Sequence, residues 1–395
     1  MTIAGPLTGI RVIEVASEFA AFAGKMLADL GAEVIVVEPP GGHHTRTYEP
    51  FADDVPGLER SLWWWHYNTS KKGVVLALGD SRFAALVDTA DMVLEAAFID
   101  DRPHRERRPE LIWVSVTPFG RAEGELRHAT DLTVLAGGPV WSCGYDDHTI
   151  PPVRGGGNQG YQTAGVFAVA SALTAYIART VHGVGQVVDV NMHACANVTT
   201  EAASYDWHVA KRVVQRMTGR HAGVTPTTSS IAPAADGRMV HTGVPPRSAR
   251  EFESLLRWLD ELGLRDEFGE SFFLDMGIAR GGVHISELHV DVEATAIFNA
   301  GREAMRFLAD RLPAYDYFVG AQRYGLAAGI VYAPEEVMLD PHFVARGFPV
   351  EIFHDEIDRT AAHLGLPFVC QAAPGAITRA PRLGEHDGEI LGPLR

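Results

Sequence analysis

Two lysines and an asparagine beside a predicted strand are the first residues in the sequence whose types and spacing suggest chemistry. Asn68 precedes Lys71 and Lys72, and an apolar strand begins at Gly73. Lysine ammonium groups can reach phosphate groups as point charges, although a lysine pair at a surface is often only a solvated face. Three successive tryptophans, residues 63–65, come just before them and cannot all point to one side. We expect some of these rings to pack inward and one to stack on a flat ligand.

A second pair of candidates, Ser17 and Glu18, follows an apolar strand at Ile10–Val15. A helical pattern at Phe19–Leu30 and a second strand at Glu33–Val37 complete a βαβ unit. Ligands of open α/β sheets lie beyond the carboxyl ends of the strands, where these two residues are expected, although a solvated turn is the alternative. The turn has no glycine at which a pyrophosphate could approach the backbone, so the unit does not predict an NAD-dependent dehydrogenase.

The turn before the predicted helix at Ala164–Arg179 would stabilise a carboxylate, but the sequence has none there. A glycine-rich loop leads into a predicted helix at Ala164–Arg179, whose residues are small or apolar almost all round, so we expect it to be buried on most sides. A carboxylate at the turn of Gly160 and Tyr161 would be stabilised by the N-terminus of this helix. Between Arg154 and His182 the sequence has no Asp, Glu, Cys or His. We therefore assign no catalytic residue to this turn.

The composition argues against several classes of function. There are 34 basic and 50 acidic residues, and the net charge of −16 disfavours nucleic acid or an anionic membrane as the main partner. The three cysteines, Cys143, Cys195 and Cys370, are odd in number and unclustered, so neither disulfides nor a metal site is indicated. The N-terminus lacks the pattern of a signal peptide, and we expect a cytoplasmic protein.

The alternation of strands and helices continues to about residue 116, which predicts an α/β fold with a Rossmann-like open parallel sheet. Residues 218–235 are rich in Thr, Ser, Pro and Ala, which is typical of a linker between domains. Amphipathic patterns over 249–262 and 292–312 then predict the helices of a smaller α+β domain.

Five ordered blocks, which together span nearly the whole chain, resemble the family III CoA-transferases. That group includes formyl-CoA transferases, carnitine CoA-transferases and α-methylacyl-CoA racemase. The blocks are GPLTGIRVIEV with LADLGAEVIVVEPP (5–15 and 27–40), residues 61–78, 130–138, 179–191, and 321–346 followed by 380–387.

The resemblance implies an architecture and an assembly. Residues 1–217 and 335–395 would form a large CoA-binding α/β domain, with 218–235 as a linker and 236–334 as a small α+β domain. Two such chains would interlock as rings, giving either a homodimer or a heteromer with a homologous chain.

The resemblance also implies a reaction with coenzyme A thioesters. In the family's transferases an aspartate attacks an acyl-CoA and forms a mixed anhydride, which then exchanges CoA with a carboxylic acid. The position of this aspartate falls at Gly160 or Tyr161, and neither side chain can form the anhydride. Asn68, Lys71 and Lys72 match the block that lies along the CoA nucleotide in relatives. The chain therefore resembles the aspartate-lacking subunit of heteromeric benzylsuccinate-type CoA-transferases.

Two alternatives stay open. The chain could be active by itself, with a displaced carboxylate such as Asp146 or Asp147 reaching the thioester, or it could bind CoA without catalysis. Racemase-like members have a histidine directly before the Asp131 block, but Thr130 stands there in this chain, and His128 is two residues away. The sequence does not identify the acyl group or its acceptor.

Overall fold

The computed structural model describes residues 5–122, 129–136, 154–199, 206–211, 230–288 and 290–394. Among these, residues up to 211 and from 340 onward form one compact unit, and residues 230–339 form another. The predicted linker lies mostly outside the described residues, so the domain boundaries set from the sequence stay a prediction. Each unit has its own hydrophobic core, and each is described here by itself.

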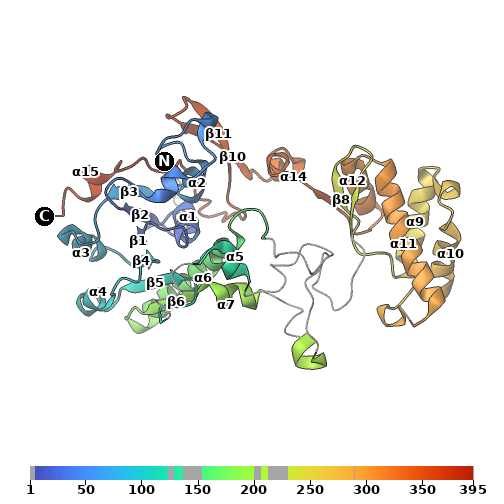
Figure 1. The fold of residues 1–395 in the computed structure, drawn as a ribbon, viewed down its shortest axis with the longest axis horizontal. Coiled ribbons are helices and arrows are strands. Elements are labelled where there is room, and N and C mark those ends of the chain that lie inside the picture. The colour runs from blue at the N-terminus through green and yellow to red at the C-terminus, as the bar shows by residue number, and fades with distance from the viewer. Residues whose placement is uncertain are drawn as a thin grey trace. The chain divides into compact units, whose positions relative to one another are not determined.

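The first unit is built on a six-stranded sheet in the order β3-β2-β1-β4-β5-β6, in which every neighbouring pair is parallel (Figure 1). This is the Rossmann strand order, so the predicted α/β class is confirmed. The order reverses between β1 and β4, and ligands of such sheets bind beyond the carboxyl ends of the strands at that point. The strands are β1 (Arg11–Val15), β2 (Glu33–Glu38), β3 (Lys72–Val75), β4 (Met92–Glu95), β5 (Ile112–Thr117) and β6 (Val187–Asn191).

Helices cover both faces of this sheet because alternate strand residues point to opposite sides. Val12 and Val114 pack on one face with the small residues of α1 and α6, while Ile13 and Val93 pack on the other with Phe83 of α3. The helical segments before the second unit are α1 (Ala21–Asp29), η1 (His44–Thr47), η2 (Ala52–Asp54), α2 (Leu62–Tyr67), α3 (Ser81–Val87), α4 (Arg102–Arg107), α5 (Asp131–Leu135), α6 (Gln159–His182), α7 (Met192–Val198) and the π-helical turn η5 (Asp206–Ala210).

Helix α6 is longer than the sequence pattern predicted and less enclosed. It begins at Gln159 and ends at His182, and the next residue, Gly183, adopts the left-handed conformation (φ 74°) that suits glycine at a helix C-terminus. Its buried side is a stripe of alanines and glycines, whereas Val166, Ile177 and Val181 are 53%, 64% and 72% exposed. The prediction of a helix buried on most sides is therefore wrong for the described chain. The reason is that α1, β5 and α7 cover only the small-residue stripe.

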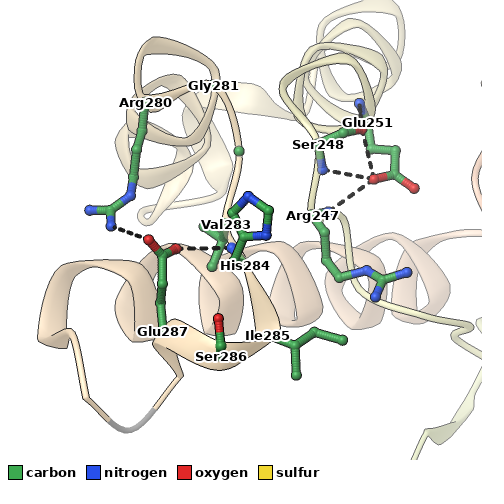
Figure 2. A pocket seen from close by; sticks show the side chains of 11 residues that line it. Arg247, Ser248, Glu251, Arg280, Gly281, Val283, His284, Ile285, Ser286 and Glu287 are labelled. Atoms are coloured by element: carbon green, nitrogen blue, oxygen red, sulfur yellow. Dashed lines mark hydrogen bonds and ion pairs between the residues drawn. The ribbon is translucent and has the colours of Figure 1, made fainter.

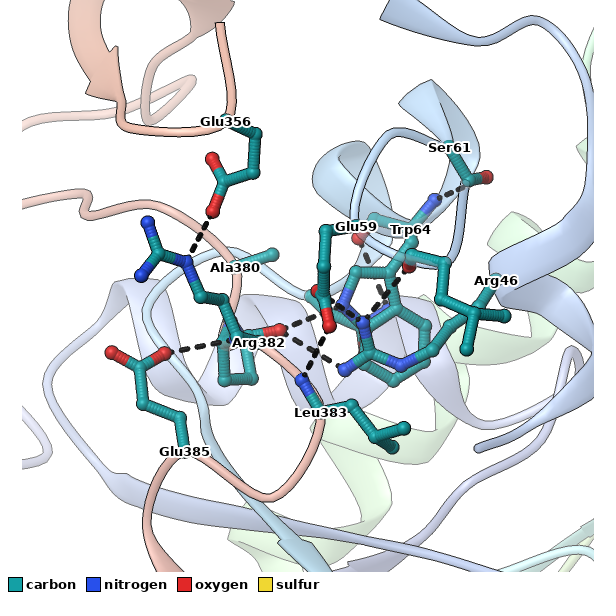
Figure 3. Close-up of polar contacts among 12 residues, drawn as sticks. Arg46, Glu59, Ser61, Trp64, Glu356, Ala380, Arg382, Leu383 and Glu385 are labelled. Carbon is teal, nitrogen blue, oxygen red and sulfur yellow. Dashed lines mark hydrogen bonds and ion pairs between the residues drawn. The ribbon is translucent and has the colours of Figure 1, made fainter. Parts of the chain in front are cut away.

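The C-terminal segment returns to the first unit and is held there by Arg46. The Arg46 guanidinium is fully buried and pairs with Glu38 through two hydrogen bonds of 2.7 and 2.8 Å. Its remaining N–H groups bond Glu59 (Figure 3) and the carbonyls of Leu58 and Pro381, so all five donors are used. The segment contains α14 (Pro341–Ala345), an antiparallel hairpin of β10 (Pro349–His354) and β11 (Arg359–Leu364), and α15 (Asp387–Ile390).

The same segment covers the exposed edge of the sheet. The backbone N–H of Gly73 in β3 donates to His386 Nδ1 (3.1 Å), and that of Val75 donates to Asp387 Oδ1 (2.8 Å). Unpaired N–H groups at a sheet edge are a template for aggregation, and here side chains satisfy them.

The second unit combines a small antiparallel sheet with a helical layer, which confirms the predicted α+β class. Helix α9 starts with a capping box of Ser248 and Glu251, and its periodic apolar residues are buried. The sheet has the order β7-β8-β9 with β7 (Ile231–Pro233), β8 (Met239–His241) and β9 (Gly329–Val331). The helical segments are α9 (Ala249–Glu261), η6 (Arg265–Glu267), α10 (Ser271–Arg280), η7 (Ile285–Glu287), α11 (Val292–Arg311), α12 (Ala314–Arg323) and α13 (Pro334–Val337).

Candidate active site

The candidate site begins where β1 ends, at the edge of the sheet at which ligands of this fold bind. Ser17 Oγ accepts a hydrogen bond from the backbone of Ala20 (3.0 Å), which fixes the turn that leads into α1. Glu18 is partly exposed, and its Oε1 accepts from His44 Nε2 (3.2 Å) and from the hydroxyl of Tyr48. The carboxylate of Glu18 is therefore held in place by two neighbours from the η1 region.

An aromatic row connects Glu18 with the start of α6. The ring of Tyr48 meets the edge of Trp63 (5.7 Å between centroids), and Trp63 packs at 4.4 Å on Tyr67. The Tyr67 hydroxyl accepts from Gln162 Nε2 in the first turns of α6 (2.9 Å). Burial raises the pKa of the Tyr67 hydroxyl, and the nearby charge of Glu18 adds to that rise.

Two of the three tryptophans pack inward, as the sequence analysis expected for some of them. Trp64 and Trp65 are buried, and their indole N–H groups donate to backbone carbonyls at 3.0 and 2.9 Å. The indole N–H of Trp63 is buried and has no acceptor among the described residues. Stacking of Trp63 on a flat ligand stays a prediction.

Asn68 and Lys71 lie inside the protein. The ammonium of Lys71 is 2.7 Å from Glu14 Oε2, and it also donates to Asn68 Oδ1 (2.9 Å) and to the carbonyl of Ala21 (3.0 Å). Both side chains of the Lys71–Glu14 pair are fully buried. Burial raises the pKa of Glu14 to about 7 and lowers that of Lys71, because water no longer stabilises either charge. These contacts give Lys71 a role in the fold.

Lys72 lies closer to the surface. Its side chain is 31% exposed, and its ammonium pairs with Glu33 at 2.9 Å and with Glu389 at 2.5 Å. Whether Ser17, Glu18, Asn68, Lys71 and Lys72 contact CoA stays a prediction.

The N-terminus of α6 holds a carboxylate after all, and it comes from a different element. Asp131 is the first residue of α5, and its Oδ1 accepts from the backbone N–H of Gly160 (2.7 Å) and of Tyr161 (3.4 Å). The ring of Tyr161 packs edge-on against Phe19 in the turn after β1 (5.0 Å), which connects this carboxylate to the same site. Sequence reasoning named Asp131 only within a family block and did not place it at this turn, because it lies 29 residues before Gly160.

Asp131 is buried, and its environment acts on its charge in two directions. Burial raises the pKa of the carboxyl group, whereas the N–H groups of Gly160 and Tyr161 and the guanidinium of Arg154 oppose that rise. A signal in the sequence was available. Thr130 forms a capping box with Thr133, which places Asp131 in the first turn of a short helix, where a carboxylate is favoured.

Other groups named from the sequence do not add to this site. Cys195 is buried, and burial raises the pKa of its thiol to about 11, so it is not a thiolate at neutral pH. Cys143, Asp146, Asp147 and His128 lie outside the described residues. Within the described ranges, no three His, Cys, Asp or Glu side chains gather as metal ligands would.

A cavity of about 660 Å³ lies in the second unit, between the start of α9 and the turn that follows α10 (Figure 2). Both carboxylates that line it accept hydrogen bonds from neighbouring residues. Glu251 accepts from the backbone of Ser248 (2.8 Å), and Arg280 donates to Glu287 (3.1 Å). Neither carboxylate is free to act as a nucleophile, so this cavity is not the candidate active site.

Helix α6 also meets the length and hydropathy expected of a membrane span, with a mean hydropathy of 1.5 over an 18-residue window. Within the described residues, 28% of that window is buried, and the helix packs against α1, β5 and α7.

Known proteins resemble this chain along almost its whole length. The succinyl-CoA:(R)-benzylsuccinate CoA-transferase subunit BbsE of Thauera aromatica is 28% identical over 399 residues, which cover 96% of this chain and 92% of the relative. The succinyl-CoA–D-citramalate CoA-transferase of Chloroflexus aurantiacus is 28% identical over 407 residues, covering 98% and 93%. The crystal structure of a CAIB/BAIF family protein from Brucella suis shares the fold, with a TM-score of 0.77, 22% identity, and coverage of 99% of this chain and 100% of that one. Residues 7–270 match CoA-transferase family III, and the chain therefore belongs to this family.

Proposed function

We propose that this chain takes part in the transfer of CoA from an acyl-CoA to a carboxylic acid, as the subunit that lacks the family aspartate in a heteromeric enzyme. The observation that carries the proposal is the start of α6. The chain belongs to the family, but Gly160 and Tyr161 stand where the family aspartate is expected. BbsE, a relative over most of its length, is itself a subunit of a CoA-transferase. A homologous chain would then supply the aspartate.

The site residues proposed for CoA are Ser17, Glu18, Asn68, Lys71 and Lys72, and no metal is required. Lys72, which is partly exposed, is the lysine best placed for the phosphates, since Lys71 has its donors committed inside the protein. Asn68 and Lys71 would then shape the CoA site from beneath. We keep the prediction of a cytoplasmic location, which suits an enzyme that uses CoA thioesters.

We also propose that two chains interlock as rings. The exposed apolar residues Val166, Ile177 and Val181 of α6 support this, because an apolar stripe of this kind is stabilised when a partner covers it. Interlocked chains bury more than a standard interface of roughly 1,600 Å², so the dimer should not dissociate on dilution. Sedimentation at nanomolar concentration should find no folded monomer of 42.9 kDa, and finding one would contradict the interlocked assembly.

A second arrangement is favoured by one observation. The chain would be active by itself through a displaced carboxylate, and Asp131 places a carboxylate on the backbone N–H groups of Gly160 and Tyr161. The two arrangements differ in the chain from which the carboxylate comes.

The test uses the purified chain alone and mixed with the family member encoded next to it. We expect the chain to bind CoA in isothermal calorimetry and the mixture to transfer CoA from succinyl-CoA to added dicarboxylates. Transfer by the mixture alone supports the heteromer, and transfer by the isolated chain supports the second arrangement. If neither sample binds CoA or transfers it, the proposed function is wrong.

A further inference from the structure

The sequence has four lysines, and they differ in how far a reagent in solution can reach them. Lys71 and Lys72 belong to the proposed CoA site, Lys25 lies in α1, and Lys211 follows directly after η5. An acyl-CoA is a thioester, and its carbonyl carbon can be attacked by a lysine amine. The amine is a nucleophile only when it carries no proton and when the thioester can reach it. The surroundings of each lysine therefore decide which of the four a thioester can acylate.

Lys25 and Lys71 are closed off by burial. The Lys71 side chain is fully buried, and its ammonium donates to three acceptors inside the protein. Burial lowers the pKa of Lys71, which by itself would favour the free amine, but a thioester cannot reach a side chain that has no exposed surface. The side chain of Lys25 is only 9% exposed, and its ammonium is 2.7 Å from Asp29. Neither lysine is open to an acyl-CoA while the chain is folded.

Lys72 can be reached from solvent, but it is held between two carboxylates. Its ammonium lies 2.9 Å from Glu33 and 2.5 Å from Glu389. Partial burial disfavours the charge of Lys72, but the hydrogen bonds with the two carboxylates outweigh that effect and raise the pKa of its ammonium. A rise of one pKa unit lowers the fraction of free amine at neutral pH about tenfold. Lys72 therefore stays protonated and is a poor nucleophile.

Lys211 has neither kind of protection. Its side chain is exposed, and among the residues that the structure describes no carboxylate forms an ion pair with it. Its ammonium lies over the ring of Trp207, 5.6 Å from the centroid, and a cation–π contact at an exposed site is weak. Trp207 and Val209 of the same turn are 52% and 86% exposed. A thioester in solution can therefore reach this amine without entering a cavity.

We propose that Lys211 is the site at which acyl-CoA thioesters acylate this chain. The unprotonated Nζ of Lys211 attacks the thioester carbonyl carbon, a C–N bond forms, the C–S bond breaks, and the CoA thiolate leaves with the electron pair. The nitrogen loses a proton, which the thiolate takes up, so the products are an amide on Lys211 and free CoA. The step needs no catalytic aspartate, no oxidant and no reductant. It rests on the proposed function only for bringing acyl-CoA to the protein.

The test is to let the full chain react with succinyl-CoA and to map the lysine amides by peptide mass spectrometry. The digest uses a protease that cleaves after acidic residues, because trypsin does not cleave after an acylated lysine. We expect Lys211 to be succinylated at least about tenfold faster than Lys25, Lys71 or Lys72. The matched control is the same chain unfolded in urea. Burial and ion pairs are lost there, so the four lysines should react at similar rates.

Two variants separate the protection of Lys72 from the reactivity of Lys211. Glu389→Gln removes one carboxylate from Lys72 at the surface, where Glu389 is 57% exposed, and should raise the rate at Lys72 severalfold without changing the rate at Lys211. Lys211→Arg keeps the positive charge and should remove most of the lysine amide formed on the folded chain.

The inference is overturned if Lys211 of the folded chain stays unmodified, or if one of the other three lysines reacts as fast. The proposed function is judged by a separate readout, which is CoA binding in calorimetry and CoA transfer by the mixture. A chain that is acylated at Lys211 but, alone and with its partner, neither binds nor transfers CoA would refute the proposed function and leave this inference in place.

Discussion

Replacing Lys71 by methionine should reveal whether this lysine serves the fold or the ligand. The substitution removes the ammonium that lies 2.7 Å from Glu14 and leaves that carboxylate fully buried without a counter-charge. Two further acceptors, Asn68 Oδ1 and the Ala21 carbonyl, lose their donor as well. Breaking a buried ion pair by removing one partner costs about 3–5 kcal/mol, which is a large part of the total stability of a typical domain.

The penalty should also depend on pH in a defined direction. In the wild-type protein the pKa of Glu14 is about 7, so above that pH the carboxylate is ionised and paired. In Lys71→Met the carboxyl group must stay protonated or be buried as a lone charge. Keeping the Glu14 carboxyl protonated in the folded variant costs about 1.4 kcal/mol more for each pH unit. The loss of stability relative to the wild-type protein should therefore grow by about 2 kcal/mol between pH 7 and pH 8.5.

Urea unfolding followed by tryptophan fluorescence measures this loss, with Lys72→Met as the control. Lys72 is 31% exposed, and exposed ion pairs contribute at most about 1 kcal/mol. The double variant Glu14→Gln with Lys71→Met should recover most of the loss, because no charge is left buried. If Lys71→Met unfolds like Lys72→Met and instead loses CoA affinity, the structural interpretation of Lys71 is refuted.

Two further predictions concern the first unit. His43, His66 and His363 are half-buried, and this burial lowers their pKa values to about 3, about 4 and about 4. The unfolded chain therefore takes up protons first as the pH falls below 6.5. The contribution of these histidines to stability is fully present above pH 6.5 and should fall by up to ~1 kcal/mol per histidine per pH unit down to about pH 4. Protonation of Glu14 raises the stability as the pH falls from 7 to 4.5, but this is a single group against three. Unfolding curves at pH 7.5 and 5 that give equal stability would contradict this. Arg46→Lys keeps the charge but offers three donors instead of five, so we expect the free energy of unfolding to fall by about 2 kcal/mol or more. Proteolysis in the C-terminal segment should become faster. Unchanged protease resistance would show that other contacts hold the segment.

The elements of the fold could be read from the sequence because they depend on local patterns. The apolar runs at residues 10–15 and 33–37 are β1 and β2, and the helical spacing between them is α1. Hydrophobic periodicity decides such elements residue by residue, without regard to the rest of the chain. The sequence blocks also predicted the family, and the match of residues 7–270 to CoA-transferase family III confirms that prediction.

The sequence also determined which side chains the α6 turn lacks, but only the tertiary structure decided what stands in their place. Asp131 reaches Gly160 because α5 packs beside the start of α6, and Lys71 meets Glu14 across a separation of 57 residues. Such pairings depend on strand order and on helix packing, which bring distant residues together at one edge of the sheet. Local periodicity carries no information about them, because the same strand and helix patterns are compatible with other orders of the strands.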